Sequence, residues 1–127
     1  MPKIWAEIRE YNRAFPEMSN REMAMEFLKC FCAGDIDGLA PLLADDLRFK
    51  GPLHEFNLSG AYLQSLRDDP PDKCSYRVLS LTQAADHVSI YYDYEKDDGA
   101  LTVAQLFGFA NGKISEILLV FDSRGFG

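Results

Sequence analysis

The chain has 127 residues, of which 47% are hydrophobic and 26% charged, a composition typical of one globular domain with a single core. Its net charge of −7 argues against nucleic acid as a partner, because binding to phosphates depends on clustered Lys and Arg side chains. No apolar run is long enough to span a membrane, and residues 1–10 lack the apolar centre of a signal peptide, so we expect a cytoplasmic protein without a membrane partner.

The N-terminal part of the chain has helical periodicity. Residues 3–14 place apolar side chains on one stripe, so we expect residues 1–18 to form a helical extension of the domain. Ser19 followed by Glu22 is a capping-box pattern and predicts the start of a second helix. Gly34 ends the apolar stripe of that helix and predicts its C-terminus.

Two shorter helices and a strand are expected next. Asp35 has the side chain of an N-cap and predicts a short third helix, and Ser59 in the same way predicts a fourth. Between them, residues 47–50 alternate as in a short strand, which the Gly-Pro pair at 51–52 ends. Residues 68–72, rich in Asp and Pro, predict a loop.

The remainder of the chain alternates between apolar and polar residues, as strands do. The pair Asn111-Gly112 predicts a two-residue type I′ turn between antiparallel strands. Helices first and a strand meander afterwards indicate an α+β fold rather than a parallel sheet. The expected strands cover residues 74–84, 87–96, 101–110 and 113–122.

The last hairpin predicts an apolar surface on both faces of the sheet. With a two-residue turn, Ala110 lies opposite Lys113 and Ala104 lies opposite Leu119. One apolar face packs on the helices, and the other needs a cover because monomers rarely expose so much apolar surface. We therefore predict a homodimer through the outer sheet face. The alternative is that the N-terminal helix, with Trp5, covers that face.

The cysteines and histidines indicate neither a disulfide framework nor a metal site. Cys30 and Cys32 are two residues apart in an expected helix, so they point in different directions, and Cys74 opens an expected strand. We therefore predict reduced, packed thiols. The two histidines have no His-x-x-x-His spacing, and no Cys-x-x-Cys pair accompanies them, so we expect no metal and no cofactor.

Two segments resemble a known family. They are the run Phe31-Cys32-Ala33-Gly34-Asp35-Ile36-Asp37-Gly38-Leu39 with Leu42-Leu43-Ala44-Asp45-Asp46, and the hairpin Phe109-Ala110-Asn111-Gly112-Lys113-Ile114 with Phe121-Asp122. They are similar to the SnoaL-like and ketosteroid isomerase-like proteins of the nuclear transport factor 2 superfamily, over about residues 19–126. The resemblance implies one α+β domain over residues 1–127. In it a curved, mainly antiparallel sheet with a mixed edge wraps around three to four N-terminal helices as a cone, the cystatin-like arrangement.

The resemblance also locates the catalytic residues of the ketosteroid isomerases. Their general-base Asp corresponds to Gly51, and their oxyanion-hole Tyr corresponds to Phe27. Their protonated Asp corresponds to Ala104, or to Gln105 if the hairpin register shifts by one residue. Proton abstraction beside a carbonyl needs both a base and oxyanion donors, so we do not expect this reaction.

Limonene epoxide hydrolases resemble the chain as well, and their water-activating residues are also replaced. Their Arg and first Asp correspond to Tyr92 and Tyr94, and their second Asp to Leu119. Their water-holding Tyr and Asn correspond to Phe49 and Gly51. Without this acid–base set, we do not expect epoxide hydrolysis.

The cone positions that remain are apolar and aromatic. Tyr92 shares a strand face with Val88 and Ile90, which predicts that it points inward, while His54 follows the first strand and is the best candidate for a general base. Tyr62 either closes the mouth of the cone or packs in the core, and His54 is otherwise a solvent-facing loop residue. The expected lining is Phe27, Phe49, His54, Tyr62, Tyr92, Tyr94, Ala104, Ile117, Leu119 and Phe121.

Three functions follow from this lining. The first is binding, or an unassigned reaction, of a small apolar or aromatic molecule in the cone. The second is a noncatalytic dimeric module that docks on another protein, with the cone filled by its own side chains. The third is proton transfer by His54 with Tyr92 or Tyr94.

Overall fold

The structure is a computed structural model that describes residues 18–97 and 99–122, so the helix expected over residues 3–14 lies outside the described part. The elements follow the expected order of helices before the meander. They are α2 (Asn20–Ala33), α3 (Ile36–Leu39), the 3₁₀ helix η1 (Ala40–Leu42), β1 (Leu43–Lys50), β2 (Glu55–Phe56), α4 (Ser59–Asp68), β3 (Ser75–Ala84), β4 (His87–Lys96), β5 (Gly99–Ala110) and β6 (Lys113–Val120).

Helix α2 begins and ends where its sequence predicts. The Ser19 hydroxyl accepts from the Glu22 amide, and the Glu22 carboxylate accepts from the Ser19 amide, both at 3.1 Å. At the other end, Gly34 has a φ of 70°, and its N–H reaches back to the Phe31 carbonyl at 3.1 Å. One side of the helix, including Met23 and Phe27, is buried against the sheet.

The elements between α2 and β3 differ in detail from the expectation. Asp35 caps α3 as predicted, accepting from the Gly38 amide at 2.9 Å. Strand β1 begins at Leu43 rather than at residue 47, because its first residue pairs with β6. The N-cap of α4 is Leu58, without a side-chain bond, so the prediction that Ser59 caps this helix is wrong.

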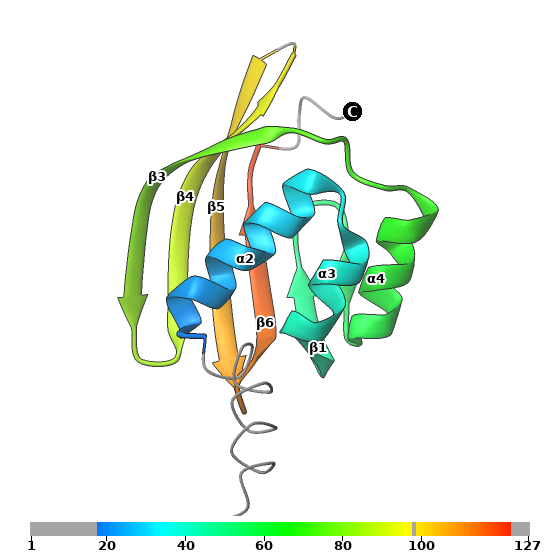
Figure 1. Ribbon diagram of the computed structural model, residues 1–127, viewed down its shortest axis with the longest axis vertical. Coiled ribbons are helices and arrows are strands. Elements are labelled where there is room, and N and C mark those ends of the chain that lie inside the picture. The colour runs from blue at the N-terminus through cyan, green and yellow to red at the C-terminus, as the bar shows by residue number, and fades with distance from the viewer. Residues whose placement is uncertain (1–17, 98, 123–127) are drawn as a thin grey trace, which may run out of the picture.

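The strands form one curved six-stranded sheet in the described residues, with the order β2-β1-β6-β5-β4-β3. Every neighbouring pair is antiparallel except β1 and β6, which are parallel. The helices α2, α3 and α4 lie on one side of the sheet (Figure 1), with α2 against β3 and β4 and α4 against β1 and β2. The predicted α+β cone is therefore confirmed, and its core lies between the sheet and these helices.

The register of the last hairpin differs from the prediction by one residue. Asn111 and Gly112 form the expected turn, with φ of 55° and 75° and with Ala110 opposite Lys113. Beyond the turn, Ser115 is an extra residue that creates a β-bulge, since Phe109 pairs with Ile114 while Gly108 pairs with Glu116.

This bulge changes which side chains of β5 and β6 share a face. Ala104 pairs with Val120, and Gln105 pairs with Leu119, so the predicted pairing of Ala104 with Leu119 is wrong. Because side chains alternate along a strand, Gln105 joins the buried face with Phe107, and Ala104 lies on the outer face.

Within residues 18–97 and 99–122, no helix is long and apolar enough to cross a bilayer.

The two serines at helix starts give a matched test of capping. We expect Ser19→Ala to lower the free energy of unfolding by about 1 kcal/mol, because it removes the capping box of α2. Ser59→Ala should change it by less than about 0.5 kcal/mol, because Ser59 does not cap α4. Urea denaturation measures both values, and equal losses would contradict the assignment of the caps.

Candidate functional site

Three aromatic rings close one end of the interior. The Tyr62 ring, on α4, stacks on the Phe49 ring of β1 with centroids 4.7 Å apart. Phe56, on the short strand β2, lies 6.0 Å from Phe49 and 5.8 Å from Tyr62. Strand β2 was not predicted, because two residues carry too little periodicity, so the sequence did not indicate the place of Phe56 in this cluster.

A buried polar pair lies on the inner face of the sheet. The Tyr92 hydroxyl, on β4, donates to the Gln105 side-chain oxygen, on β5, at 2.7 Å. Tyr92 is 4% exposed and Gln105 is 5% exposed. Burial, as the main cause, raises the pKa of Tyr92 far above its usual range, so its hydroxyl is a neutral donor throughout the physiological pH range.

The side-chain nitrogen of Gln105 and the hydroxyl of the buried Tyr62 are hydrogen-bond donors that have no protein acceptor in the described part of the chain. The Gln105 amide nitrogen carries two hydrogens, and the Tyr62 hydroxyl carries one. Tyr62 is 3% exposed, and burial alone raises its pKa well above the usual range, as expected of a phenol that no neighbour stabilises in its charged form. The Tyr62 phenol also adds to the raised pKa of Tyr92, after burial and the Cys32 thiol, so the two phenols face the same interior.

Unpartnered buried donors are uncommon in proteins. Leaving such a group without an acceptor costs about 1–3 kcal/mol, and each case needs a physical explanation. No charged side chain is among the buried residues of the described chain, so the Gln105 amide has no buried charge to pair with. The buried interior of the described chain is therefore apolar and aromatic, with two kinds of neutral donor and no charged side chain.

Tyr94 lies two residues beyond Tyr92 on β4, and its hydroxyl binds outside the buried polar pair. Its hydroxyl donates to the Asp72 carbonyl at 3.2 Å, so its tip points to the loop before β3. Its ring packs edge-on against Phe31 at 6.5 Å. Tyr94 thus closes the side of the core that is next to the end of α2.

Most of the residues expected to line the cone lie together in the structure, and one of them, Ala104, does not. Ala104 is on the outer face, so its predicted place in the cone is wrong, and Gln105 takes that place. Among the expected residues, those in the buried core are Phe27, Phe49, Tyr62, Tyr92 and Ile117, and those partly buried against it are Tyr94, Leu119 and Phe121.

His54 lies at the edge of the aromatic cluster. It is exposed, in the loop between β1 and β2, and its carbonyl accepts from the Gly51 amide at 2.9 Å. Its ring is 5.9 Å from that of Phe56. No carboxylate among the described residues pairs with the imidazole, and none of their His, Cys, Asp and Glu side chains gather in groups of three that could hold a metal ion.

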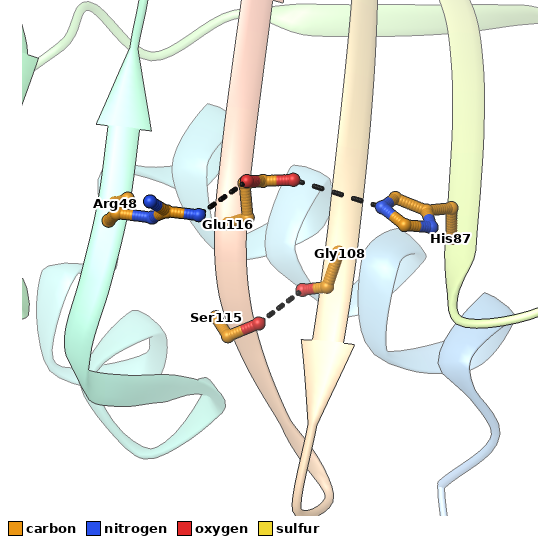
Figure 2. Close-up of polar contacts among 5 residues, drawn as sticks. All are labelled: Arg48, His87, Gly108, Ser115 and Glu116. Carbon is orange, nitrogen blue, oxygen red and sulfur yellow. Dashed lines mark hydrogen bonds and ion pairs between the residues drawn. The ribbon is translucent and has the colours of Figure 1, made fainter.

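The outer face carries a charged network of its own. Glu116 on β6 accepts from Arg48 of β1 at 3.2 Å and lies 3.8 Å from the His87 ring of β4, with Gly108 of β5 between them (Figure 2). A Cβ at position 108 would come within 3.2 Å of the Glu116 Cβ and 3.4 Å of the His87 ring nitrogen, so glycine leaves the space in which they meet. The Ser115 hydroxyl, at the bulge, donates to the Gly108 carbonyl at 3.4 Å.

Comparison with known proteins identifies the family. Residues 24–117 match the SnoaL-like domain family. The chain belongs to the SnoaL-like family. A comparison with curated proteins found no match.

Several solved structures share the fold of this chain. An NTF2-like protein of unknown function from Cytophaga hutchinsonii has a TM-score of 0.74 at 19% identity, over 86% of this chain and 95% of that one. A de novo designed protein with a curved β-sheet has a TM-score of 0.72 at 21% identity, over 86% and 93%. An LEH-like epoxide hydrolase of M. tuberculosis has a TM-score of 0.67 at 16% identity, over 81% and 82%. At these identities the similarity shows the fold alone.

The two tyrosines of the SnoaL-like interior differ in a way that denaturation detects. We expect Tyr92→Phe to lower the free energy of unfolding by about 1–3 kcal/mol, because it leaves the Gln105 oxygen buried without a donor. Tyr62→Phe should leave that free energy unchanged or raise it, because it removes a buried hydroxyl that has no partner.

Urea denaturation of both variants without added ligand checks this pair. A loss for Tyr62→Phe as large as that for Tyr92→Phe would show that the Tyr62 hydroxyl already has an acceptor, such as a buried water.

Proposed function

We propose that this SnoaL-like chain binds a small, mostly apolar molecule with one hydrogen-bond acceptor inside the cone. The observation that carries the proposal is the pair of unpartnered buried donors, the Tyr62 hydroxyl and the Gln105 amide. A ligand carbonyl or ether oxygen has the lone pairs that these donors lack in the described chain. Binding would then recover about 1–3 kcal/mol for each donor that it pairs.

The surroundings of the donors favour an apolar ligand over a charged one. Phe49, Phe56 and Tyr62 present ring faces and edges, which suit a flat or aromatic molecule. An ionised ligand would lose its hydration without finding an opposite charge, since no charged side chain is among the buried residues described. Phe56 is the only one of these three rings that is partly exposed, so we expect a ligand to enter beside it.

Binding, rather than a reaction, is the function that this interior supports. Gln105 stands where the resemblance locates the protonated Asp of the ketosteroid isomerases, and its amide donates a hydrogen bond without being able to exchange a proton. The position of their general base is Gly51, and His54 is exposed outside the aromatic cluster. The M. tuberculosis protein is described as an LEH-like epoxide hydrolase. In this chain, the positions that correspond to the two catalytic Asp residues of limonene epoxide hydrolases hold Tyr94 and Leu119.

A pair of matched compounds tests the proposal. We use 1-tetralone, a bicyclic aromatic ketone, and tetralin, the same skeleton without the carbonyl. We expect 1-tetralone to bind at least about 5-fold more tightly, because only the ketone accepts from Tyr62 and Gln105. Isothermal titration calorimetry measures both dissociation constants.

Two variants locate the binding. Tyr62→Phe should weaken 1-tetralone by about 5–10-fold and leave tetralin unchanged, because it removes one donor and no ring. Tyr91→Phe, a phenol-to-phenyl change on the outer face, should affect neither compound. Equal binding of ketone and hydrocarbon, or no binding of either, would refute the proposal.

A second proposal, independent of the first, is that two copies of this chain pair through their outer sheet faces. Tyr91 and Val120 are each 53% exposed there, and Leu118 is 39% exposed. Together with Leu106 and Ala104 they form an apolar strip across β4, β5 and β6. Contiguous apolar surface of this kind usually marks an interface.

Charges at the two ends of this strip fit a second copy. One end holds the Arg48–Glu116–His87 network, and the other holds Asp93, which accepts from Arg77 at 3.0 Å and from Thr102 at 2.8 Å. Both ends carry both signs of charge, so two strips related by a two-fold axis can place unlike charges opposite each other.

Oligomeric mass tests this second proposal. Light scattering after gel filtration should give twice the chain mass of 14.4 kDa, and Leu118→Lys should give 14.4 kDa, because it buries a charge in the strip. Leu53→Lys, at an exposed loop residue off the strip, should remain dimeric. A wild-type chain at 14.4 kDa at the highest soluble concentration would contradict the proposal and favour cover by residues 1–17.

A further inference from the structure

The end of α2 and the start of β3 are joined at two cysteines. The Cys74 amide donates to the Cys32 carbonyl at 3.0 Å, which brings the two main chains close together. The flanking residues hold this arrangement from both sides, because the Tyr94 hydroxyl binds the Asp72 carbonyl and the Lys73 side chain lies over the helix end. An amide–carbonyl bond of this kind leaves the α-carbons within the separation that a disulfide spans.

The main-chain bond places both thiols in the same neighbourhood, and they differ in access to solvent. Cys32 is 4% exposed, and burial, assisted by the neighbouring Cys74 thiol, raises its pKa to about 12. Cys74 is half-buried and lines a surface hollow of about 460 Å³, with Lys73 and Lys96 among the residues around it. A small oxidant therefore reaches Cys74 first, and Cys32 is the thiol beside it.

We propose that Cys32 and Cys74 are a modification site at which a peroxide forms an intramolecular disulfide. The Cys74 sulfur attacks hydrogen peroxide, giving a sulfenic acid on Cys74 and releasing one water. The Cys32 sulfur then attacks the Cys74 sulfur, forming the S–S bond and releasing a second water with the Cys32 proton. Two thiols lose two electrons and the peroxide gains them, and a dithiol reductant reverses the reaction.

Cys30 is excluded from this pair by its own geometry. Its thiol donates to the Glu26 carboxylate at 3.4 Å, one helical turn earlier, and burial raises its pKa to about 11. Cys30 and Cys32 are two residues apart on the same helix, so their side chains point in different directions. Cys30 therefore serves as the matched control.

Intact mass and thiol titration of the purified, reduced chain test the proposal. The chain has three cysteines, and after treatment with hydrogen peroxide we expect one titratable thiol and a mass lower by two hydrogens. A tryptic map should contain peptide 30–48 joined to peptide 74–77, and tandem mass spectrometry of this pair should place the bond on Cys32 rather than on Cys30. Dithiothreitol should restore all the thiols. The crosslink closes a long loop, so we also expect the oxidised chain to melt about 5 °C higher or more.

Two variants complete the test. Cys30→Ser should still lose two thiols and two hydrogens, whereas Cys74→Ser should form no internal crosslink. The wild-type peptide map decides the matter even if a variant fails to fold. Added oxygen on Cys74 without a crosslink, a disulfide between two chains, or a disulfide that includes Cys30 would each overturn the proposal.

Discussion

The β-bulge at Ser115 determines which side chains of β6 enter the interior and which lie on the outer face of the sheet. A shift of one residue in the register of a strand exchanges its inward-facing and outward-facing side chains. With the bulge, Leu119 lies opposite the buried Gln105, and Glu116 lies outside between Arg48 and His87. Without it, Glu116 would face the aromatic core, where an unpaired carboxylate is strongly unfavourable.

The bulge therefore keeps the Glu116 carboxylate out of an interior whose donors are neutral. The interior holds the Tyr62 and Tyr92 hydroxyls and the Gln105 amide, which donate hydrogen bonds without carrying charge. The ion pairs of Glu116 with Arg48 and His87, and of Arg77 with Asp93, lie on the outer face, where solvent supports them and each contributes little to stability. This division favours recognition of a neutral ligand inside and of another protein surface outside, and both proposals rest on it.

The features predicted correctly from sequence are those that local chemistry determines. The capping box at Ser19, the left-handed residue Gly34 and the turn at Asn111-Gly112 each depend on a few neighbouring residues, and the structure confirms all three. Alternation along β4 placed Tyr92 inward for the same reason. The family and the cone followed from short motifs around these local signals.

The features missed depend on pairing between distant strands. The bulge at Ser115, the short strand at Phe56 and the early start of β1 are set by partners far along the chain, and no local pattern indicates them. The partner of Tyr92 could be identified only with the register known. One signal was present, since Gln105 is the only polar residue among residues 103–110, and a polar residue needs a partner wherever it is buried.

The central claim is that the side-chain N–H groups of the buried Gln105 have no hydrogen-bond acceptor until a ligand binds. The side-chain amide signals of Gln105 in ¹⁵N–¹H NMR spectra test this claim most directly. In the free chain these protons should lack the downfield shift of hydrogen-bonded amides, and saturating 1-tetralone should move at least one of them downfield. Protons already hydrogen-bonded in the free chain, or unchanged by a ketone that binds, would contradict the account.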